Sequence, residues 1–342
     1  MTSIRSSARG ALARAAGILA AGATLAIGVP ALARAAETIA IDGSSTVFPV
    51  TEAVAEEFQG KERGQVRVTV GISGTGGGFK KFCRGETDIS DASRPIVKEE
   101  IEACKAAGIQ YIELPIAYDA ITVAVSPQND WVSEISVEDL KKIWEPEAQE
   151  KVTRWNQVRP EWPDQPLMLF GAGADSGTFD YFTEAITGKA KASRGDFTGS
   201  EDDNVLVQGI ENNKNALGYI PYAYYLPHKE RMKALAIVAK PGAQGVLPSL
   251  EAVKSGTYQP LSRPLFLYVS AKSAERPAVQ RFVEFLLSEG PALIEEVGYL
   301  PLPAQAYETA RKRFVERKVG TVFGGVPEVG IPVEELLERE AR

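Results

Sequence analysis

Short runs of strand-forming residues alternate with stretches of helical periodicity along most of the chain. The predicted strands cover residues 38–41, 66–72, 87–91, 111–115, 120–125, 167–170, 216–220 and 266–269. The predicted helices cover residues 47–59, 77–83, 98–107, 137–143, 177–186, 203–212, 247–254, 277–288 and 291–297. Such alternation indicates an α/β fold, in which helices cover both faces of a mostly parallel sheet and ligands bind at the carboxyl ends of strands.

Two segments differ from this pattern. Residues 144–166 hold three Trp and several Pro with little periodicity, which predicts an irregular segment with buried Trp side chains. Residues 331–342 are typical of a short, charged amphipathic helix.

One pattern occurs three times: a strand breaks into a loop of Ser, Thr and Gly, and the loop opens a helix. The copies cover residues 38–50, 66–82 and 167–182. The first turn of a helix has backbone N–H groups without intrahelical partners and a partial positive charge, so it can receive an anion without a metal. Three such ends brought together would form a small polyanion site, although helix capping alone would explain the hydroxyls of the first loop.

The second loop contains three consecutive glycines, which weaken a helix start unless the backbone must approach something closely. It is not a P-loop, because no Gly-Lys-Ser/Thr follows, and it lacks the last Gly of GxGxxG, so nucleotide binding is not the leading interpretation. A fourth loop places Ser93 and Arg94 directly after a predicted strand. A solvated charge is the ordinary alternative for Arg94, but its position favours the fork-shaped donor of an oxyanion site.

The first 35 residues have the features of a signal peptide: a basic start, a small apolar stretch, and A-x-A cleavage choices ending at Ala35 or Ala36. A membrane span is the alternative, but the stretch is rich in Gly and Ala and only weakly hydrophobic. We therefore expect cleavage of residues 1–35 and a soluble periplasmic protein. The segment contains four Arg and no acidic residue, so its removal takes the formal net charge from −7 to −11. This charge disfavours a nucleic-acid partner.

The two cysteines, Cys83 and Cys104, favour a disulfide, because their even number occurs in a chain expected in an oxidising compartment; two buried thiols remain the alternative. A metal site is not expected, since His228 is the only histidine. A catalytic triad lacks a plausible His base, and Ser176 stands one place too late for G-x-S-x-G. We therefore predict a binding protein, not an enzyme, without a cofactor.

The segments GSSTVFPV, SGTGGGFKKFCRGETDISDASRPI, GADSGTFDYF, NALGYIPYAYY and VGYLPLP resemble, in order and spacing, the phosphate-binding subunit of bacterial phosphate ABC transporters, in the branch typical of cyanobacteria. The resemblance covers nearly the whole chain after the signal peptide. It implies a type II periplasmic binding protein, with two α/β lobes joined by a two-strand hinge and the ligand in the cleft. It also implies that the protein binds inorganic phosphate and delivers it to membrane permease subunits for import.

The resemblance also predicts which loop residues bind the phosphate. The matching positions are Thr46, Val47, Thr75, Gly76, Ser176, Gly177 and Thr178. Ser45 and Ser73 are candidates as neighbours of these positions, and Ser93 and Arg94 are candidates where the chain departs from the family. The family's best-known branch has an acidic proton acceptor where this chain has Ser93 and an Arg where it has Ala172, so Arg94 is expected to supply the cation instead. The candidates for the carboxylate that accepts the phosphate proton are Asp91, Asp119 and Asp175. Selectivity against sulfate stays open with that assignment.

The same resemblance gives the domain boundaries. Lobe one is expected over residues 37–115 and 264–342, and lobe two over residues 116–263. We expect a monomer. The alternatives are a binding protein for another oxyanion, sulfate-like or molybdate-like, and a secreted phosphate-binding protein that is not coupled to a transporter.

Overall fold

The computed structural model describes residues 36–326 and 328–340. Its strands are β1 (Glu37–Gly43), β2 (Val66–Ile72), β3 (Ile89–Ala92), β4 (Tyr111–Val125), β5 (Glu134–Ser136), β6 (Met168–Ala172), β7 (Thr198–Ser200), β8 (Ala216–Pro221), β9 (Lys233–Ala234), β10 (Ala236–Val238), β11 (Ser262–Ser270) and β12 (Leu300–Pro301). Its helices are α1 (Phe48–Glu62), α2 (Gly74–Phe82), α3 (Lys98–Ala106), α4 (Val137–Trp144), α5 (Gly177–Thr187), α6 (Asp203–Glu211), α7 (Tyr222–Tyr225), α8 (Leu250–Lys254), α9 (Pro277–Ser288), α10 (Gly290–Glu296), α11 (Ala304–Val315) and α12 (Val333–Glu340). The predicted signal peptide, residues 1–35, lies outside the described residues.

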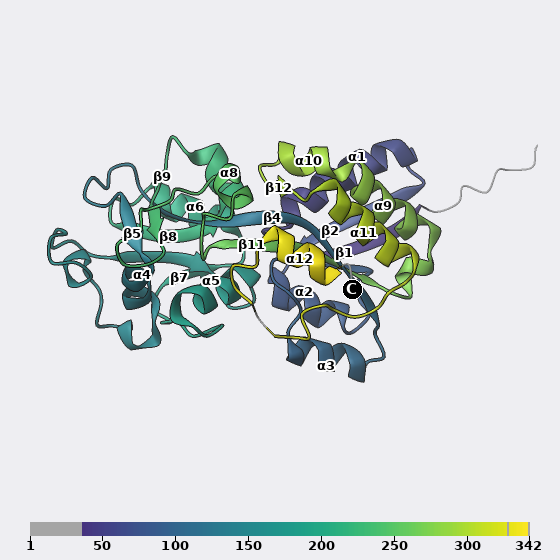
Figure 1. Ribbon diagram of the computed structural model, residues 1–342, viewed down its shortest axis with the longest axis horizontal. Helices are drawn as coiled ribbons and strands as arrows, with labels where there is room; N and C mark the ends of the chain where they lie inside the picture. Colours follow the sequence, from purple (N-terminus) through teal and green to yellow (C-terminus); the bar gives the residue numbers. More distant parts are fainter. Residues whose placement is uncertain (1–35, 327, 341–342) are drawn as a thin grey trace, which may run out of the picture. The chain divides into compact units, whose positions relative to one another are not determined.

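A ten-stranded sheet runs through the described chain in the order β2-β1-β3-β11-β4-β8-β6-β7, and β9 and β12 also pair with β4. Its first part is parallel, because β1 pairs in parallel with β2 and with β3. Its second part is parallel as well, because β6 pairs in parallel with β7 and with β8. Antiparallel pairing through β11 and β4 joins the two parts (Figure 1).

The strand β4 is the long connection between the two parts of the sheet. It runs for 15 residues, all buried, and pairs first with β11 and then, from Ile121 to Val125, with β8. The sequence predicted two separate strands here, over 111–115 and 120–125, and that division is wrong. Pro115 is tolerated because the register with β11 shifts beside it, and a proline at such an irregularity removes no ladder hydrogen bond.

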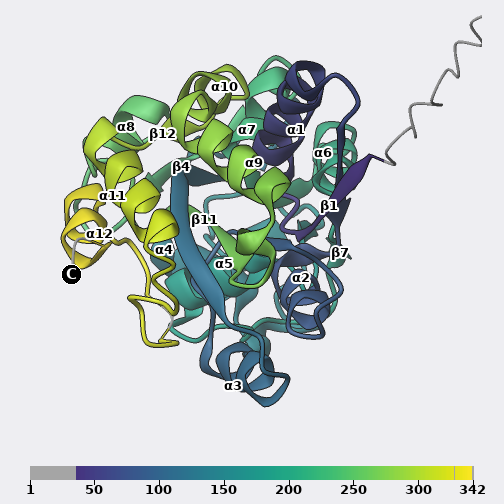
Figure 2. The same ribbon diagram turned by 90° about the vertical axis from the view of Figure 1, so that its right-hand side faces the viewer.

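Helices cover both faces of the first part of the sheet, as the alternation predicted. Figure 2 shows α1, α9 and α11 on one side of β1, β11 and β4, with α2 and α3 on the opposite side. Helix α11 was not predicted, although Ala306, Ala310 and Phe314 form a buried stripe at helical spacing. Among the described residues, no helix has the length and apolarity needed to cross a bilayer.

The irregular segment between α4 and β6 packs as the sequence predicted. Trp144, Trp155 and Trp162 are all buried in the main hydrophobic core. The ring of Trp144 contacts Phe182 of α5 edge to face, with the ring centroids 5.7 Å apart. Trp144, the last residue of α4, therefore supports the helix that carries one of the three loops, and the three Trp side chains are structural.

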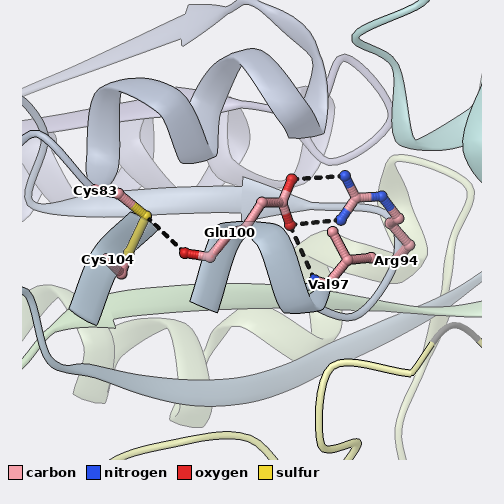
Figure 3. Close-up of a disulfide and its surroundings, with 5 residues drawn as sticks. All are labelled: Cys83, Arg94, Val97, Glu100 and Cys104. Atoms are coloured by element: carbon pink, nitrogen blue, oxygen red, sulfur yellow. Dashed lines mark hydrogen bonds and ion pairs between the residues drawn. A yellow bond between two sulfur atoms is a disulfide. The ribbon is translucent and has the colours of Figure 1, made fainter. Parts of the chain in front are cut away.

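A disulfide joins Cys83, which follows α2, to Cys104 in α3, with the two Cα atoms 4.3 Å apart (Figure 3). The predicted disulfide is confirmed. The same view shows Glu100 of α3 directed at the guanidinium of Arg94. The bond therefore fixes α3, which carries Glu100, against α2.

Replacing Cys83 and Cys104 together by Ser should lower the free energy of unfolding by about 3 kcal/mol, because opening a loop of this length increases the entropy of the unfolded chain. Urea titrations of the oxidised protein and the variant, followed by circular dichroism, measure the difference. Reductant should weaken the unsubstituted protein to the level of the variant and leave the variant unchanged. Coincident titrations of the oxidised protein and the variant would contradict this expectation.

Candidate functional site

The three strand–loop–helix units bring their loops together at one place. The hydroxyl of Thr46, before α1, lies 3.0 Å from the hydroxyl of Thr178 in α5. The hydroxyl of Thr75 in α2 lies 3.2 Å from that of Ser93, which follows β3. A Cβ atom on Gly177 would lie 2.4 Å from Thr75 Oγ1 and 2.5 Å from Ser93 Oγ, so these hydroxyls face the first turn of α5. The side chains of Thr46, Thr75, Ser93, Ser176 and Thr178 are all buried and are called the hydroxyl cluster below.

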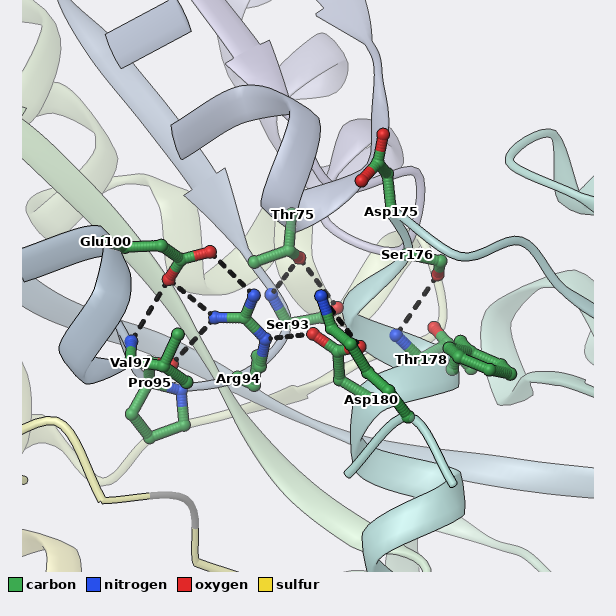
Figure 4. Close-up of polar contacts among 12 residues, drawn as sticks. Thr75, Ser93, Arg94, Pro95, Val97, Glu100, Asp175, Ser176, Thr178 and Asp180 are labelled. Carbon is green, nitrogen blue, oxygen red and sulfur yellow. Dashed lines mark hydrogen bonds and ion pairs between the residues drawn. The ribbon is translucent and has the colours of Figure 1, made fainter. Parts of the chain in front are cut away.

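Close backbone contacts hold the loops in position. Ser176 caps α5, because its Oγ accepts a hydrogen bond from the N–H of Thr178 at 3.1 Å (Figure 4). The N–H of Gly76 donates to the carbonyl of Asp175 at 2.9 Å. Gly74 has a φ of +73°, and a Cβ atom there would lie 2.3 Å from the same carbonyl oxygen. Glycine is required at this position because the loops before α2 and α5 leave no room for a side chain.

The cation nearest to the hydroxyl cluster is Arg263 of β11, which the sequence analysis did not single out. Its Nη2 donates to Thr46 Oγ1 at 3.1 Å and to Thr178 Oγ1 at 2.9 Å. The side chain is completely buried, and within the described chain its Nη1 has no hydrogen-bond partner. A buried guanidinium nitrogen without a partner costs free energy, so this nitrogen indicates a position where an acceptor binds.

Asp119 of β4 balances the charge of Arg263. The two residues are direct partners in the antiparallel register of β4 and β11, and both Nε and Nη2 of Arg263 donate to Asp119 Oδ2, at 3.2 and 3.0 Å. Both side chains are fully buried. Burial raises the pKa of Asp119 to about 6, and the opposing effect of Arg263 limits the rise. The pair therefore anchors the guanidinium at the junction of the two parts of the sheet.

Arg94 lies beside the hydroxyl cluster, but its guanidinium contacts carboxylates. Figure 4 shows it between Glu100 of α3 and Asp180 of α5. Its Nη1 and Nη2 donate to the two oxygens of Glu100, at 2.9 and 2.7 Å, and its Nε donates to Asp180 Oδ2 at 2.7 Å. Nη1 also donates to the carbonyl of Pro95 at 3.1 Å. Each of the three nitrogens therefore has a partner, unlike those of Arg263.

The other predicted residues lie around the cluster with partners of their own. Ser45 donates a hydrogen bond to the carboxylate of Asp203, the first residue of α6. The hydroxyl of Ser73 donates a hydrogen bond to Asp42 Oδ1, so Ser73, like Ser45, has a carboxylate partner outside the cluster. The N–H of Val47 donates to the carbonyl of Ser44 at 3.2 Å.

The three candidate proton acceptors differ in environment. Asp175 forms an ion pair with Lys80 at 2.7 Å, and both side chains are largely exposed. Asp91 is buried beneath α1 and accepts a hydrogen bond from Thr51 at 2.9 Å. Burial raises the pKa of Asp91 to about 7, and the hydrogen bond from Thr51 opposes the rise. Asp119 is the candidate that contacts Arg263.

Asp203 is a fourth buried carboxyl, which the sequence analysis missed. Burial raises its pKa to about 7 against the effect of its hydrogen bond with Ser45, and the charge of Arg263 also lowers it. Asp203 Oδ2 and Asp119 Oδ1 have no hydrogen-bond partner within the described residues. Around Arg263 there are thus two carboxyl oxygens that can accept a proton from a bound ligand. Among residues 36–326 and 328–340, no group of three or more His, Cys, Asp or Glu is placed to hold a metal ion.

Comparisons with known proteins show the family of the chain. Residues 28–290 match the PBP superfamily domain. Protein SphX of Synechocystis sp. is 51% identical over 93% of this chain and 95% of its own length. The phosphate-binding protein PstS of Staphylococcus haemolyticus is 39% identical over 79% of this chain and 83% of its own. The chain belongs to the PBP superfamily. Within that superfamily it groups with SphX and PstS, so the resemblance stated from the sequence is confirmed.

Solved structures give the fold of this superfamily member. A possible phosphate-binding protein from Planctomyces limnophilus is 48% identical and matches with a TM-score of 0.61, covering 83% of this chain and 99% of its own. A putative phosphate ABC transporter substrate-binding protein from Clostridium perfringens, solved with bound phosphate, is 26% identical with a TM-score of 0.65, covering 78% and 100%. The predicted type II periplasmic binding fold is confirmed. These relatives are named as binding proteins, not as enzymes.

A signal for Arg263 was present in the sequence of this PBP superfamily member. The tripeptide Ser-Arg-Pro occurs twice, at residues 93–95 directly after β3 and at residues 262–264 at the start of β11. The first copy was predicted to supply the cation because hydroxyl-rich loops surround it in the sequence. The second copy is remote in sequence from the three loops, and only the pairing of β11 with β4 brings it to them.

Replacing Asp91 by Asn should stabilise the protein more at pH 8 than at pH 5. The folded-state pKa of about 7 lies above the ordinary value of 3.8, so the stabilisation from the protonated carboxyl is fully present below about pH 4 and is lost as the pH rises through 7. Asn does not ionise, so the difference in unfolding free energy, variant minus unsubstituted protein, should rise by roughly 1–3 kcal/mol between the two pH values.

Urea titrations of both proteins at pH 5 and pH 8 test this expectation. The amide oxygen of Asn can still accept the hydrogen bond from Thr51, so packing is preserved at both pH values. A stability difference that does not change with pH would show that Asp91 has the same pKa in the folded and unfolded protein.

Proposed function

We propose that this protein binds inorganic phosphate with high affinity and delivers it to the permease of an ABC transporter for import. The name of the PstS relative supports the ligand, and the Clostridium perfringens structure, named as a phosphate ABC transporter substrate-binding protein with bound phosphate, supports the ligand and the transport role. The observation that carries the proposal for this chain is the buried guanidinium of Arg263, which lies among hydroxyl donors with its Nη1 unpaired in the described chain. Such a group selects a small oxyanion that can accept hydrogen bonds on several sides.

The anion is held without a metal. Hydroxyl groups of the cluster donate to its oxygens, and the first turns of α1, α2 and α5 contribute N–H groups and partial positive charge. Gly177 is the N–H donor expected at α5. Val47 and Gly76 stay predictions as ligands, because their N–H groups donate to the carbonyls of Ser44 and Asp175 in the protein. The cation is Arg263, and Ser45 and Ser73 stay predictions as direct ligands.

Buried carboxyls provide the means to separate phosphate from sulfate. Phosphate near neutral pH carries a proton that it can donate to a carboxylate, whereas sulfate is unprotonated and is repelled by the same group. Asp119 accepts hydrogen bonds from Arg263, and Asp203 interacts with its charge. Each of the two carboxyls has one oxygen without a hydrogen-bond partner among the described residues. We assign the proton acceptor to this pair because both interact with Arg263, whereas Asp175 is exposed in an ion pair with Lys80 and Asp91 is buried beneath α1 against Thr51.

We further propose that residues 1–35 direct export and that the protein acts as a periplasmic monomer. Lobe one consists of residues 37–115 and 264–342, and lobe two of residues 116–263. The sheet supports this division, because its two parallel parts are connected through β4 and β11. The lobes close around the anion, and the permease recognises this closed form.

Titration calorimetry should show phosphate binding with a Kd of about 1 µM or lower. Sulfate should give no heat under the same conditions, because it cannot donate a hydrogen bond to the buried carboxylate. The protein is first unfolded and refolded to remove any bound anion. Absence of heat with phosphate would contradict the proposed function. Tight binding of sulfate or molybdate would show that the ligand is a different oxyanion.

Replacing Arg263 by Lys should weaken phosphate binding at least about tenfold. Lysine keeps the positive charge opposite Asp119 but loses the planar fork that donates to several acceptors at once, so unfolding of the anion-free protein should change much less than the affinity. Replacing Arg276 by Lys is the matched control. Arg276 also pairs with carboxylates, Glu37 and Asp88, but on the surface of the first part of the sheet. Equal affinities for the two variants would show that Arg263 does not contact the anion.

A further inference from the structure

Arg94 joins elements from the two parts of the sheet. It follows β3 of the first part, and Asp180 lies in α5, which follows β6 of the second part. Their ion pair is 2.7 Å long, and each side chain is only 5% exposed. This ion pair adds to the hydrogen bonds between Thr46 and Thr178 and between Gly76 and Asp175, which also connect the two parts beside the hydroxyl cluster.

Contacts within the first part of the sheet hold the guanidinium of Arg94 in position. Glu100 accepts from two nitrogens of the guanidinium and also from the N–H of Val97 at the start of α3. The disulfide between Cys83 and Cys104 fixes the same helix against α2. The guanidinium is therefore presented to Asp180 from a rigid base, and pairing costs little side-chain entropy.

A second ion pair makes the same connection in a different environment. Lys80 of α2 contacts Asp175, which precedes α5, at 2.7 Å, but the two side chains are 61% and 42% exposed. Exposed pairs of this kind contribute little, because water and salt screen them. Of these two ion pairs, the buried pair of Arg94 and Asp180 is therefore the one whose loss would shift the equilibrium between the closed and open arrangements of the two lobes.

Asp180 is also in an unfavourable place for an anion site. Its carboxylate accepts a hydrogen bond from Arg94, the neighbour of Ser93, and Figure 4 shows it beside the hydroxyl cluster. Repulsion alone would make the protein bind an anion better without this carboxylate. Two cations offset this charge, the exposed Lys191 at 3.9 Å and the buried Arg94 at 2.7 Å, and the buried contact is the stronger one.

We propose that Arg94 and Asp180 form a latch that holds the two parts of the sheet closed over the bound anion and sets the rate at which phosphate leaves. This inference rests on the proposed function for its ligand. Arg94 acts as a positioning residue, and Arg263 alone provides the cation that contacts phosphate.

The decisive variant is Asp180→Asn. It removes the ion pair and leaves Arg94 paired with Glu100, so no buried charge loses its only partner. The latch predicts weaker phosphate binding, because the closed arrangement loses its connection. Direct contact of Arg94 with phosphate predicts the opposite, since the variant frees the guanidinium and removes a nearby negative charge.

Kinetics separate the latch from a general loss of structure. We expect the dissociation rate, measured by chase of labelled phosphate, to rise at least about fivefold in Asp180→Asn, with the association rate within about twofold of the unsubstituted protein. Combining Asp180→Asn with Arg94→Gln should add little to the effect of Arg94→Gln alone, because both changes break the same interaction. Tighter or unchanged phosphate binding in Asp180→Asn, or additive effects in the double variant, would overturn the latch.

Asp196→Asn is the matched control. Asp196 also pairs with a buried arginine, Arg194, through two hydrogen bonds of 2.6 and 2.7 Å, but away from the hydroxyl cluster. This variant should leave both rate constants unchanged. A rise in the dissociation rate equal to that of Asp180→Asn would show that any loss of a buried arginine pair has this effect, and would overturn the latch.

Small-angle scattering of the anion-free protein gives a readout that does not depend on phosphate. Asp180→Asn should have a larger radius of gyration than the unsubstituted protein, because the open arrangement becomes more populated. If the unsubstituted protein binds no phosphate, the proposed function fails and this measurement alone decides the latch. An unchanged radius of gyration in that case would overturn it.

Discussion

The buried ion pair between Asp119 and Arg263 is the interaction on which the rest of the structure depends. It joins the two long strands, β4 and β11, at the point where the two parallel parts of the sheet meet. Two charges can occupy the centre of a buried strand pair only because each is the other's partner, since an isolated charge there would carry a large desolvation cost. The same pair directs the guanidinium to Thr46 and Thr178. One ion pair therefore both connects the two parts of the sheet and forms the centre of the site.

The site attracts an anion through local groups and not through the charge of the whole protein. The formal net charge is −7, and several carboxylates lie close to the hydroxyl cluster. Positive potential comes from Arg263 and from the first turns of three helices, in surroundings from which water is largely excluded. Because Asp119 already neutralises most of the arginine charge, the hydrogen bonds of hydroxyl and N–H groups determine which anion fits.

The two copies of Ser-Arg-Pro show how tertiary structure changes the role of one short motif. Arg94 has carboxylates on both sides, from α3 and α5, and all its nitrogens donate to partners. Arg263 has one carboxylate and two threonine hydroxyls, and one of its nitrogens is unpaired within the described chain. Identical local sequence therefore produces a structural cation in one place and a group with remaining binding capacity in the other.

The sequence by itself determined the alternation of strands and helices, the hydroxyl-rich loops at the starts of α1, α2 and α5, the disulfide and the family. These features depend on local periodicity, on turn and capping residues, and on motif order, all of which are written along the chain. Only the tertiary structure decided that β4 is continuous, that Arg263 reaches the loops, and that Asp203 lies beside Ser45. Those features depend on the register between β4 and β11, which brings Asp119 and Arg263 together although they are more than 140 residues apart in the sequence. They also depend on which buried charges become partners. Neither is set by the residues next to them in the sequence, because burial and pairing are properties of the packed chain.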